Sequence, residues 1–216
     1  VCSSDLAEIL RVDYQPHAKL QTNLRVSNTA DQQEVPWGSW VNGSINFPLT
    51  PIVFKQPGRG ATLRATWTVS PTIFNELSGG VSQNRLSYYP RDPEKVDRKK
   101  LGIDLPQWNP GLNASNFIPN INFSQVQNWA NPSMSDGTPY DNANLIISIT
   151  DNLSKIWKMH QFKFGFYYER TRKDQSANAA TRGSIGFNNN TLNEYDTGYA
   201  YANAFVGTFD SYTEAN

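Results

Sequence analysis

The amino-acid sequence predicts an all-β protein, an antiparallel meander of about seven strands. Apolar and polar residues alternate along several segments, and the links between those segments are short and long in turn. No apolar run approaches the roughly 18 residues that a membrane-spanning helix needs, so any membrane insertion would have to use strands. Together these observations favour part of a transmembrane β-barrel with long extracellular loops.

The strongest alternation lies in residues 161–169, which read QFKFGFYYE. Successive side chains of a strand point to opposite faces, so one face of this strand is aromatic and the other carries charge. Nine residues span roughly 30 Å, and a tilt near 45° brings this to about the 25 Å apolar band of an outer membrane. An amphipathic strand of a soluble sandwich would show the same pattern, so this segment alone leaves both folds open.

The same alternation, with turn residues between the segments, places the other strands. The expected strands lie near residues 8–15, 18–28, 60–70, 73–88, 142–154, 161–173 and 208–216. The fourth is the least regular, because Leu77 and Val81 share one face whereas Leu86 and Tyr88 fall on the other. A bulge, or an emergence from the bilayer, is expected near residues 82–84.

Alternation also assigns strand residues to two faces. The residues expected to face lipid are Leu20, Leu24, Leu63, Ala65, Trp67, Ile147, Phe162, Phe164, Phe166 and Tyr168. The residues expected to face the lumen are Lys19, Arg25, Arg64, Glu76, Lys163 and Glu169. Charged residues in mid-strand suit a water-filled lumen.

Short links join the strands in pairs, and long links separate the pairs. The short links are residues 15–17, 70–72 and 154–160. The long stretches near residues 29–59, 89–141 and 174–207 are rich in Asn, Pro, Gly and Ser and exceed ordinary loop lengths. Outer-membrane barrels have this asymmetry, with the long loops outside. Residues 198–207 are expected to form one or two turns of helix.

Composition and motifs argue against several classes of function. The chain has 216 residues, no formal net charge and a mean hydropathy of -0.58. The neutral charge and the lack of a basic stripe argue against nucleic acid as a partner. No Cys/His cluster has metal-ligand spacing, and no nucleophile elbow or phosphate-binding glycine loop is found. We therefore expect no catalytic residue, metal site or cofactor, and His17 and His160 are interpreted as polar anchors at short turns.

Some tryptophans lie in the long loops rather than in strands, namely Trp37, Trp40, Trp108 and Trp129. One interpretation is a stacking surface for an incoming ligand such as a sugar ring. The favoured alternative is that they anchor small loop cores against the barrel rim, because Phe117 and Ile118 are nearby packing partners.

Residues 1–6 read VCSSDL, which resembles the translated end of a sequencing-library adapter. They are therefore excluded from the fold prediction, and Cys2 would not be native. Residues 7–216 are expected to form a partial outer-membrane β-barrel domain. Both ends are expected to be truncated, because the adapter replaces the native start and the pattern stops midway at Asn216.

Residues 160–175, HQFKFGFYYERTRKDQ, resemble the strand of TonB-dependent outer-membrane receptors that usually reads His-x-Phe-Lys-Phe-Gly. Residues 149–153 and 158–160 are similar to the hairpin that precedes this strand in the family. Residues 190–216 are similar to a loop helix and strand of a large-barrel subgroup, which carries a carboxypeptidase-regulatory-like domain at its amino end. These motifs are structural and specify no ligand.

The resemblance implies a fragment of the wall of an energy-coupled transporter, which takes up a large or scarce ligand such as an oligosaccharide or a metal chelate. A complete barrel of this kind has about 22 strands and a plugged lumen. No plug domain, TonB box or terminal assembly strand is found in this sequence. The expected location is the bacterial outer membrane, and the expected partners are its lipid and, through the plug region, the TonB energy-coupling complex.

Two other functions remain open at this point. One is a passive porin-like barrel, which an upstream plug would rule out. The other is a secreted β-sandwich or propeller that binds glycans at its loops, which partitioning into lipid would distinguish from the membrane proteins.

Overall fold

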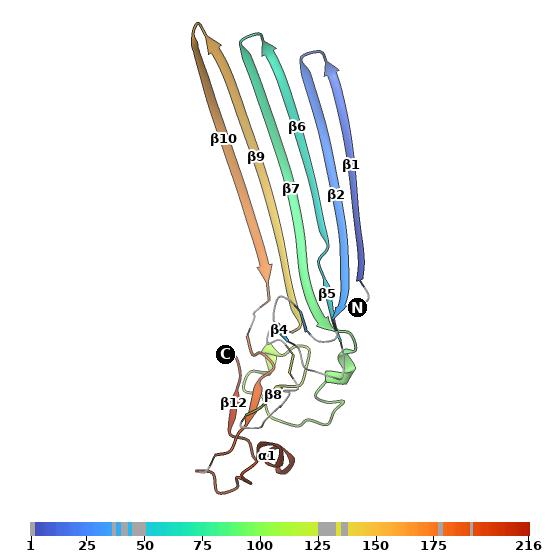
Figure 1. The fold of residues 1–216 in the computed structure, drawn as a ribbon, viewed down its shortest axis with the longest axis vertical. Coiled ribbons are helices and arrows are strands. Elements are labelled where there is room, and N and C mark those ends of the chain that lie inside the picture. The colour runs from blue at the N-terminus through green and yellow to red at the C-terminus, as the bar shows by residue number, and fades with distance from the viewer. Residues whose placement is uncertain are drawn as a thin grey trace.

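The computed structural model describes residues 3–35, 38–39, 43–44, 51–124, 133–134, 138–176, 179–190 and 192–216. Its main feature is a tall antiparallel sheet, with short strands, a helix and loops gathered at one end (Figure 1). The sheet confirms the predicted all-β meander.

Seven strands form this sheet, which we call the wall. They are β1 (Ser3–His17), β2 (Leu20–Val35), β5 (Ile52–Lys55), β6 (Gly58–Ser70), β7 (Ile73–Pro90), β9 (Tyr140–Trp157) and β10 (His160–Gln175). All neighbouring pairs are antiparallel. Because β5 and β6 share one position between β2 and β7, seven strands make six crossings of the wall.

Two-residue turns join the strands of each hairpin at the end of the wall that lies away from the loops (Figure 1). They are residues 18–19, 71–72 and 158–159. The second lies inside the predicted link at residues 70–72. The first lies beyond the predicted link at residues 15–17, and the third is shorter than predicted because β9 continues to Trp157.

The wall strands extend farther toward the loops than predicted. β2 continues to Val35 and β7 to Pro90, so the long links are shorter than the sequence indicated. β1 begins at Ser3, and residues 3–6 pair with residues 30–33. The adapter origin of residues 1–6 stays a prediction.

Gln56 and Pro57 interrupt the third crossing without changing its register. The pairing with β2 and with β7 continues in step from β5 to β6. Two backbone bonds bridge the gap, from the N–H of Gln56 to Asp31 and from the N–H of Arg85 to Pro57, each with an N···O distance of 3.0 Å. Pro57 has no N–H to donate, which explains the interruption.

Of the two alternatives expected near residues 82–84, the bulge was wrong, and the emergence from the bilayer stays a prediction. β7 pairs without a register shift with both β6 and β9 through this stretch. The apolar residues of β7 lie on opposite faces toward its two ends because their surroundings differ. Near the loops, Leu86 and Tyr88 pack under the loops, whereas Leu77 and Val81, nearer the turn, remain exposed.

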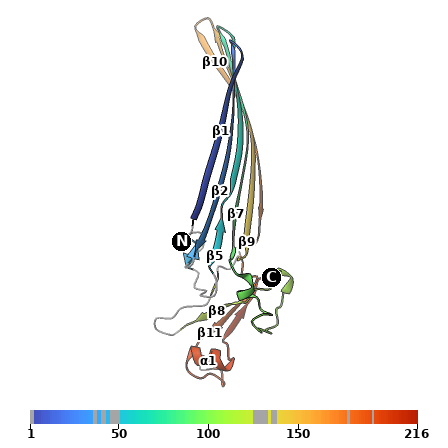
Figure 2. The ribbon, with the colours of Figure 1, turned by 90° about the vertical axis from the view of Figure 1, so that its right-hand side faces the viewer.

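Between its turns and the loops, the wall is a single layer among the described residues, as its edge-on view in Figure 2 shows. Leu24, Leu63 and Phe162 are 40%, 57% and 41% exposed, whereas a sandwich would bury all three in a dry interior. The soluble sandwich is therefore excluded as the fold.

The loops form a separate small unit. β8 (Asn120–Phe123), β11 (Ser184–Phe187) and β12 (Ser211–Thr213) make a three-stranded sheet, and β3 (Gly38–Ser39) pairs with β4 (Gly43–Ser44). Two 3-10 helices, Pro93–Val96 and Pro110–Leu112, lie in the second long loop. The helix α1 (Ala200–Val206) confirms the predicted helical turns.

The last predicted wall strand was wrong. Only residues 211–213 of the expected stretch 208–216 are extended, and they pair with β11 rather than with a wall strand. The alternation there is too short to specify which sheet the strand joins.

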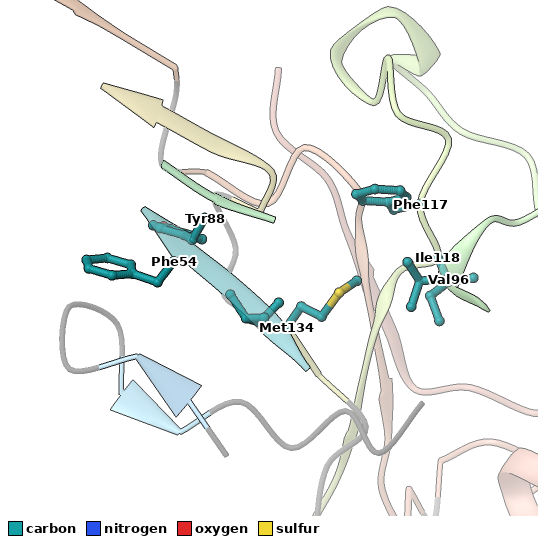
Figure 3. Close-up of a cluster of buried hydrophobic side chains, with 7 residues drawn as sticks. Phe54, Tyr88, Val96, Phe117, Ile118 and Met134 are labelled. Atoms are coloured by element: carbon teal, nitrogen blue, oxygen red, sulfur yellow. The ribbon is translucent and has the colours of Figure 1, made fainter. Parts of the chain in front are cut away.

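The buried core lies where the loops meet the wall. It consists of Ile52, Phe54, Tyr88, Val96, Phe117, Ile118 and Met134. In Figure 3, Phe54 and Tyr88 lie on the wall side and Phe117 and Ile118 on the loop side, with Met134 between the two groups. Burial of these side chains therefore fixes the loops to the ends of β5 and β7.

Of the described residues, none belongs to a helix that is both long and apolar enough to cross a membrane.

Replacing Tyr88 with alanine should release the loops while leaving the wall paired. Truncating a buried aromatic costs about 3–5 kcal/mol, and Tyr88 also stacks on Tyr140 with ring centroids 4.8 Å apart. Limited proteolysis should then cut within residues 91–124 much faster. Tyr168→Ala, which truncates a half-exposed tyrosine of the wall, should leave that cleavage rate unchanged, and equal rates in both variants would contradict the assignment of the core.

Candidate functional site

The cross-strand register brings the residues expected to face lipid onto one face of the wall. Leu24 lies opposite Leu63, Leu20 opposite Trp67, and Tyr168 opposite Ile149. Following the pairings from strand to strand places all ten on the same side. We call this side the apolar face. Most of its large side chains are exposed, because no described residue covers them.

Cross-strand rows show where the apolar character ends. One row consists of Val12, Leu24, Leu63, Gly79, Ile149 and Tyr168. The row two residues nearer the loops consists of Leu10, Val26, Ala61, Val81, Ile147 and Arg170. The next one consists of Glu8, Asn28, Arg59, Gln83, Leu145 and Arg172. Polar residues therefore replace apolar ones along nearly a single line across the wall.

One acidic residue interrupts the apolar face nearer the turns. Asp151 lies opposite Leu77 and Phe166, and the amide Nδ2 of Asn75 donates a hydrogen bond to its Oδ1 at 2.7 Å. The Nζ of Lys155 lies farther toward the turn and donates to the hydroxyl of Thr72 at 3.3 Å. Both polar groups thus have partners within the wall, which reduces the cost of placing them on this face.

The opposite side of the wall, which we call the polar face, carries the residues expected to face the lumen. Arg25, Arg64, Glu76, Lys163 and Glu169 all lie there by the same register. Lys19 lies in the turn at residues 18–19, so strand alternation does not assign it to a face.

The polar face brings two of these predicted residues into contact. Arg64 forms an ion pair with Glu76 of the neighbouring strand. Beside this pair is a hollow of about 340 Å³ whose lining includes Glu76, Asn152, Ser154 and Lys163. The face is not uniformly polar, since Phe74 and Ile146 also belong to it. A face of this composition can contact water and solutes.

The loop core packs against the polar face and leaves the apolar face open. Phe54, Tyr88 and Tyr140 are aligned across β5, β7 and β9, in step with Arg64 and Glu76. Their side chains are therefore on the polar side, where the loops cover them (Figure 3). The loops close over the polar face at one end of the wall.

Comparison with protein families gives a match that covers almost the whole chain. Residues 5–216 match the family model described as the outer membrane beta barrel domain. The chain belongs to this family. Comparisons with curated proteins and with solved structures gave no match. The wall is thus part of a barrel wall of an outer-membrane protein, and its six crossings are consecutive strands of that barrel.

Among the tryptophans proposed to bind a ligand at the loops of the barrel, the structure describes Trp108. Trp37, Trp40 and Trp129 lie outside the described residues. The Trp108 side chain is 70% exposed and meets the ring of Tyr212 edge-on, with centroids 5.2 Å apart. Phe117 and Ile118, the packing partners expected from the sequence, are buried in the loop core. The stacking role of Trp108 toward a ligand stays a prediction.

Glu214 holds the segment around Trp108 against the carboxyl-terminal segment. Its Oε2 accepts the N–H of Trp108 at 2.9 Å, and its Oε1 accepts the N–H of Asn109 at 2.8 Å. The hydroxyl of Tyr212 also donates to its Oε2 at 2.7 Å. We call this arrangement the Glu214 clasp. No sequence pattern predicts it, because Trp108 and Asn109 lie more than 100 residues from Glu214 along the chain.

The clasp shifts the pKa values of both acids. Burial opposes the charged form of Glu214, but the bonds from Tyr212, Trp108 and Asn109 outweigh it, so the pKa of the carboxyl is lowered. Burial, and then the bond to Glu214, raises the pKa of Tyr212 to about 12. The clasp is therefore formed by a carboxylate and a neutral phenol at neutral pH.

Arg182 is a second loop residue that the sequence did not single out. It is 1% exposed, and its guanidinium donates to the carbonyls of Ile118 and Met134 and to the side chain of Asn120. It thus joins the segments before β8 and β11 to the loop core.

Potential metal ligands are scattered in the described part of the chain. No three His, Cys, Asp or Glu residues there come close enough to hold a metal ion. His17 and His160 both lie next to hairpin turns, where the Nδ1 of His17 accepts the N–H of Lys19 at 3.2 Å.

Glu214→Gln should weaken the clasp at neutral pH. A carboxylate with a lowered pKa stabilises the fold above the unfolded pKa of about 4.3, and this contribution is lost as the pH falls through the folded pKa. Amide hydrogen exchange in residues 106–112 should rise on the order of tenfold in the variant at pH 7. The wild type should approach the variant only below about pH 4.

Glu94→Gln, which removes an exposed carboxylate of the same loop, is the control and should leave this exchange unchanged. A wild type that lost protection as the pH rose from 4 to 8 would contradict the sign of the effect.

Proposed function

We propose that the apolar face contacts outer-membrane lipid and that the polar face lines a water-filled lumen. Four properties of the described residues support this. The apolar face exposes large side chains over several consecutive rows, and its polar boundary crosses the strands nearly in line. The loop core covers only the polar face. From Ile73 to Gln83 the chain rises about 33 Å, or about 25 Å at a tilt near 40°, which matches an apolar band.

We further propose that the protein is an energy-coupled transporter of the TonB-dependent kind in the bacterial outer membrane. The observation that carries this is the segment HQFKFG that opens β10, together with long loops folded over the lumen side. The ligand would be large or scarce, with an oligosaccharide or a metal chelate as candidates. Coupling would pass through a plug region to the TonB complex.

The face assignment predicts opposite outcomes for two adjacent residues. Phe164, which is 61% exposed on the apolar face, should not tolerate a charge: Phe164→Lys should cost roughly 2–4 kcal/mol in lipid. Lys163→Gln on the polar face should be nearly neutral. The measurement is a folding titration of the full-length protein in lipid vesicles. Equal costs for both variants would contradict the assignment of the two faces.

The transporter and the passive porin differ in whether the lumen is closed. The full-length protein in planar lipid bilayers should conduct few ions at rest, because a plug would fill a barrel of about 22 strands. A passive porin would conduct ions as soon as it inserts. A steady open conductance would therefore contradict the proposal of an energy-coupled transporter and favour the porin. It would not contradict the proposed contact of the apolar face with lipid.

A further inference from the structure

Two hollows lie end to end on the apolar face, along the seam between β6 and β7. The one nearer the turns, which we call the lower hollow although Figure 1 draws the turns at the top, has a volume of about 400 Å³. It is lined by Ala61, Leu63, Ala65, Leu77, Gly79, Gly80, Val81 and Ile149. The upper one has a volume of about 220 Å³ and is lined by Pro57, Arg59, Gln83 and Arg85. The pairs Ala61–Val81 and Arg59–Gln83 are consecutive in the register of this face, so the two hollows adjoin.

The lower hollow exists because small residues lie between large ones. Ala61, Ala65 and Gly79 leave space that Leu63, Leu77 and Ile149 surround. A Cβ atom at Gly79 would have only the carbonyl oxygen of Ser148 within 4 Å, at 3.7 Å, which is an ordinary contact. Close packing within the wall therefore does not require glycine here, and the space is available to an apolar group from outside.

The upper hollow carries positive charge at the loop-side edge of the apolar band. Arg59 makes no ion pair with a described residue. Arg85 is held by Asp141, with its Nε 2.6 Å from Oδ1, so that pair is close to neutral. The guanidinium of Arg59 is thus the free charge of this hollow.

The other charged groups at this edge of the apolar face do not neutralise the positive charge of Arg59. Glu8 accepts a hydrogen bond from Asn28 at 2.9 Å, and it lies two strands away from Arg59. Arg172 is paired with Asp174 at 2.9 Å on β10. Arg170 adds a further positive charge near the same level. An anion at the upper hollow therefore meets net positive charge.

We propose that this seam binds one phosphate-bearing lipid of the outer leaflet, with an acyl chain in the lower hollow and a phosphate on Arg59. A guanidinium donates charge-assisted hydrogen bonds to phosphate, and the lower hollow has the size and lining of an apolar ligand site. An acyl chain enters from the membrane and its headgroup lies at the polar edge, which is the order of the two hollows. The inference rests on the proposed contact of the apolar face with lipid.

The test counts lipids bound to the full-length protein by native mass spectrometry. The protein is first folded in lipid vesicles and then moved to detergent with bis-phosphorylated lipid A, or with lipid A from which the phosphates have been removed. We expect one tightly bound phosphorylated lipid, and about tenfold lower occupancy with the dephosphorylated form. Arg59→Gln should lower the occupancy of the phosphorylated lipid by a similar factor.

Two further variants separate the parts of the site. Gly79→Leu fills the lower hollow and should lower the occupancy of both lipids without preventing insertion. Arg25→Gln removes an arginine of the polar face, opposite Thr62, and should leave lipid occupancy unchanged.

The outcomes distinguish this proposal from the one it rests on. If the wild type inserts into vesicles but binds both lipids equally, or if Arg25→Gln acts like Arg59→Gln, the lipid site is overturned and the face assignment stands. If the wild type does not insert at all, the lipid contact of the apolar face fails, and the lipid site fails with it.

Discussion

The continuous cross-strand register of the wall is the constraint on which its other properties depend. Side chains of a strand alternate between faces, so a slip of one residue in any strand would exchange its two sets of side chains. From β1 to β10 the recorded register shifts lie only next to turns, between Tyr14 and His17 and between Thr68 and Ser70. Everywhere between, Leu24, Leu63 and Ile149 stay on one side while Arg25 and Arg64 stay on the other.

The same constraint explains why the loops cover the polar face. β5 and β6 are separated by Gln56 and Pro57, yet their pairing to β2 and β7 continues in step. An extra residue at this point would have turned Phe54 toward the apolar face and away from Tyr88. Because β5 and β6 keep the same register, Phe54, Tyr88 and Tyr140 line up on the polar side. There they provide the apolar surface that the loops need to fold against. The barrel wall thus also determines where its loops pack.

Period-two patterning was sufficient to predict the six crossings and which of their residues share a side, because each strand repeats the pattern several times. It failed where a strand is short or its pattern is continuous. Ile52–Lys55 reads IVFK, an apolar run without alternation, and residues 211–213 are too few to show a period. The Glu214 clasp and the buried Arg182 depend on partners far away in the chain, and a single sequence contains no signal that pairs such residues. Trp108 could be placed in a loop, but not beside Tyr212.

The wall does not obtain its stability from the contacts visible within it. Its ion pairs are substantially exposed, as Arg64 with Glu76 shows at 50% and 29%, and such pairs contribute little in water. No described residue covers its apolar face, so the hydrophobic contribution requires a surrounding apolar medium. Its backbone groups are satisfied between strands, but β1 and β10 form the two edges, and an open edge is not tolerated in lipid. Six crossings are also fewer than the eight strands or so of the smallest outer-membrane barrels. Lipid around the apolar face and further strands at both edges are therefore conditions for a stable wall, and the strands of this chain form only an arc of the closed barrel.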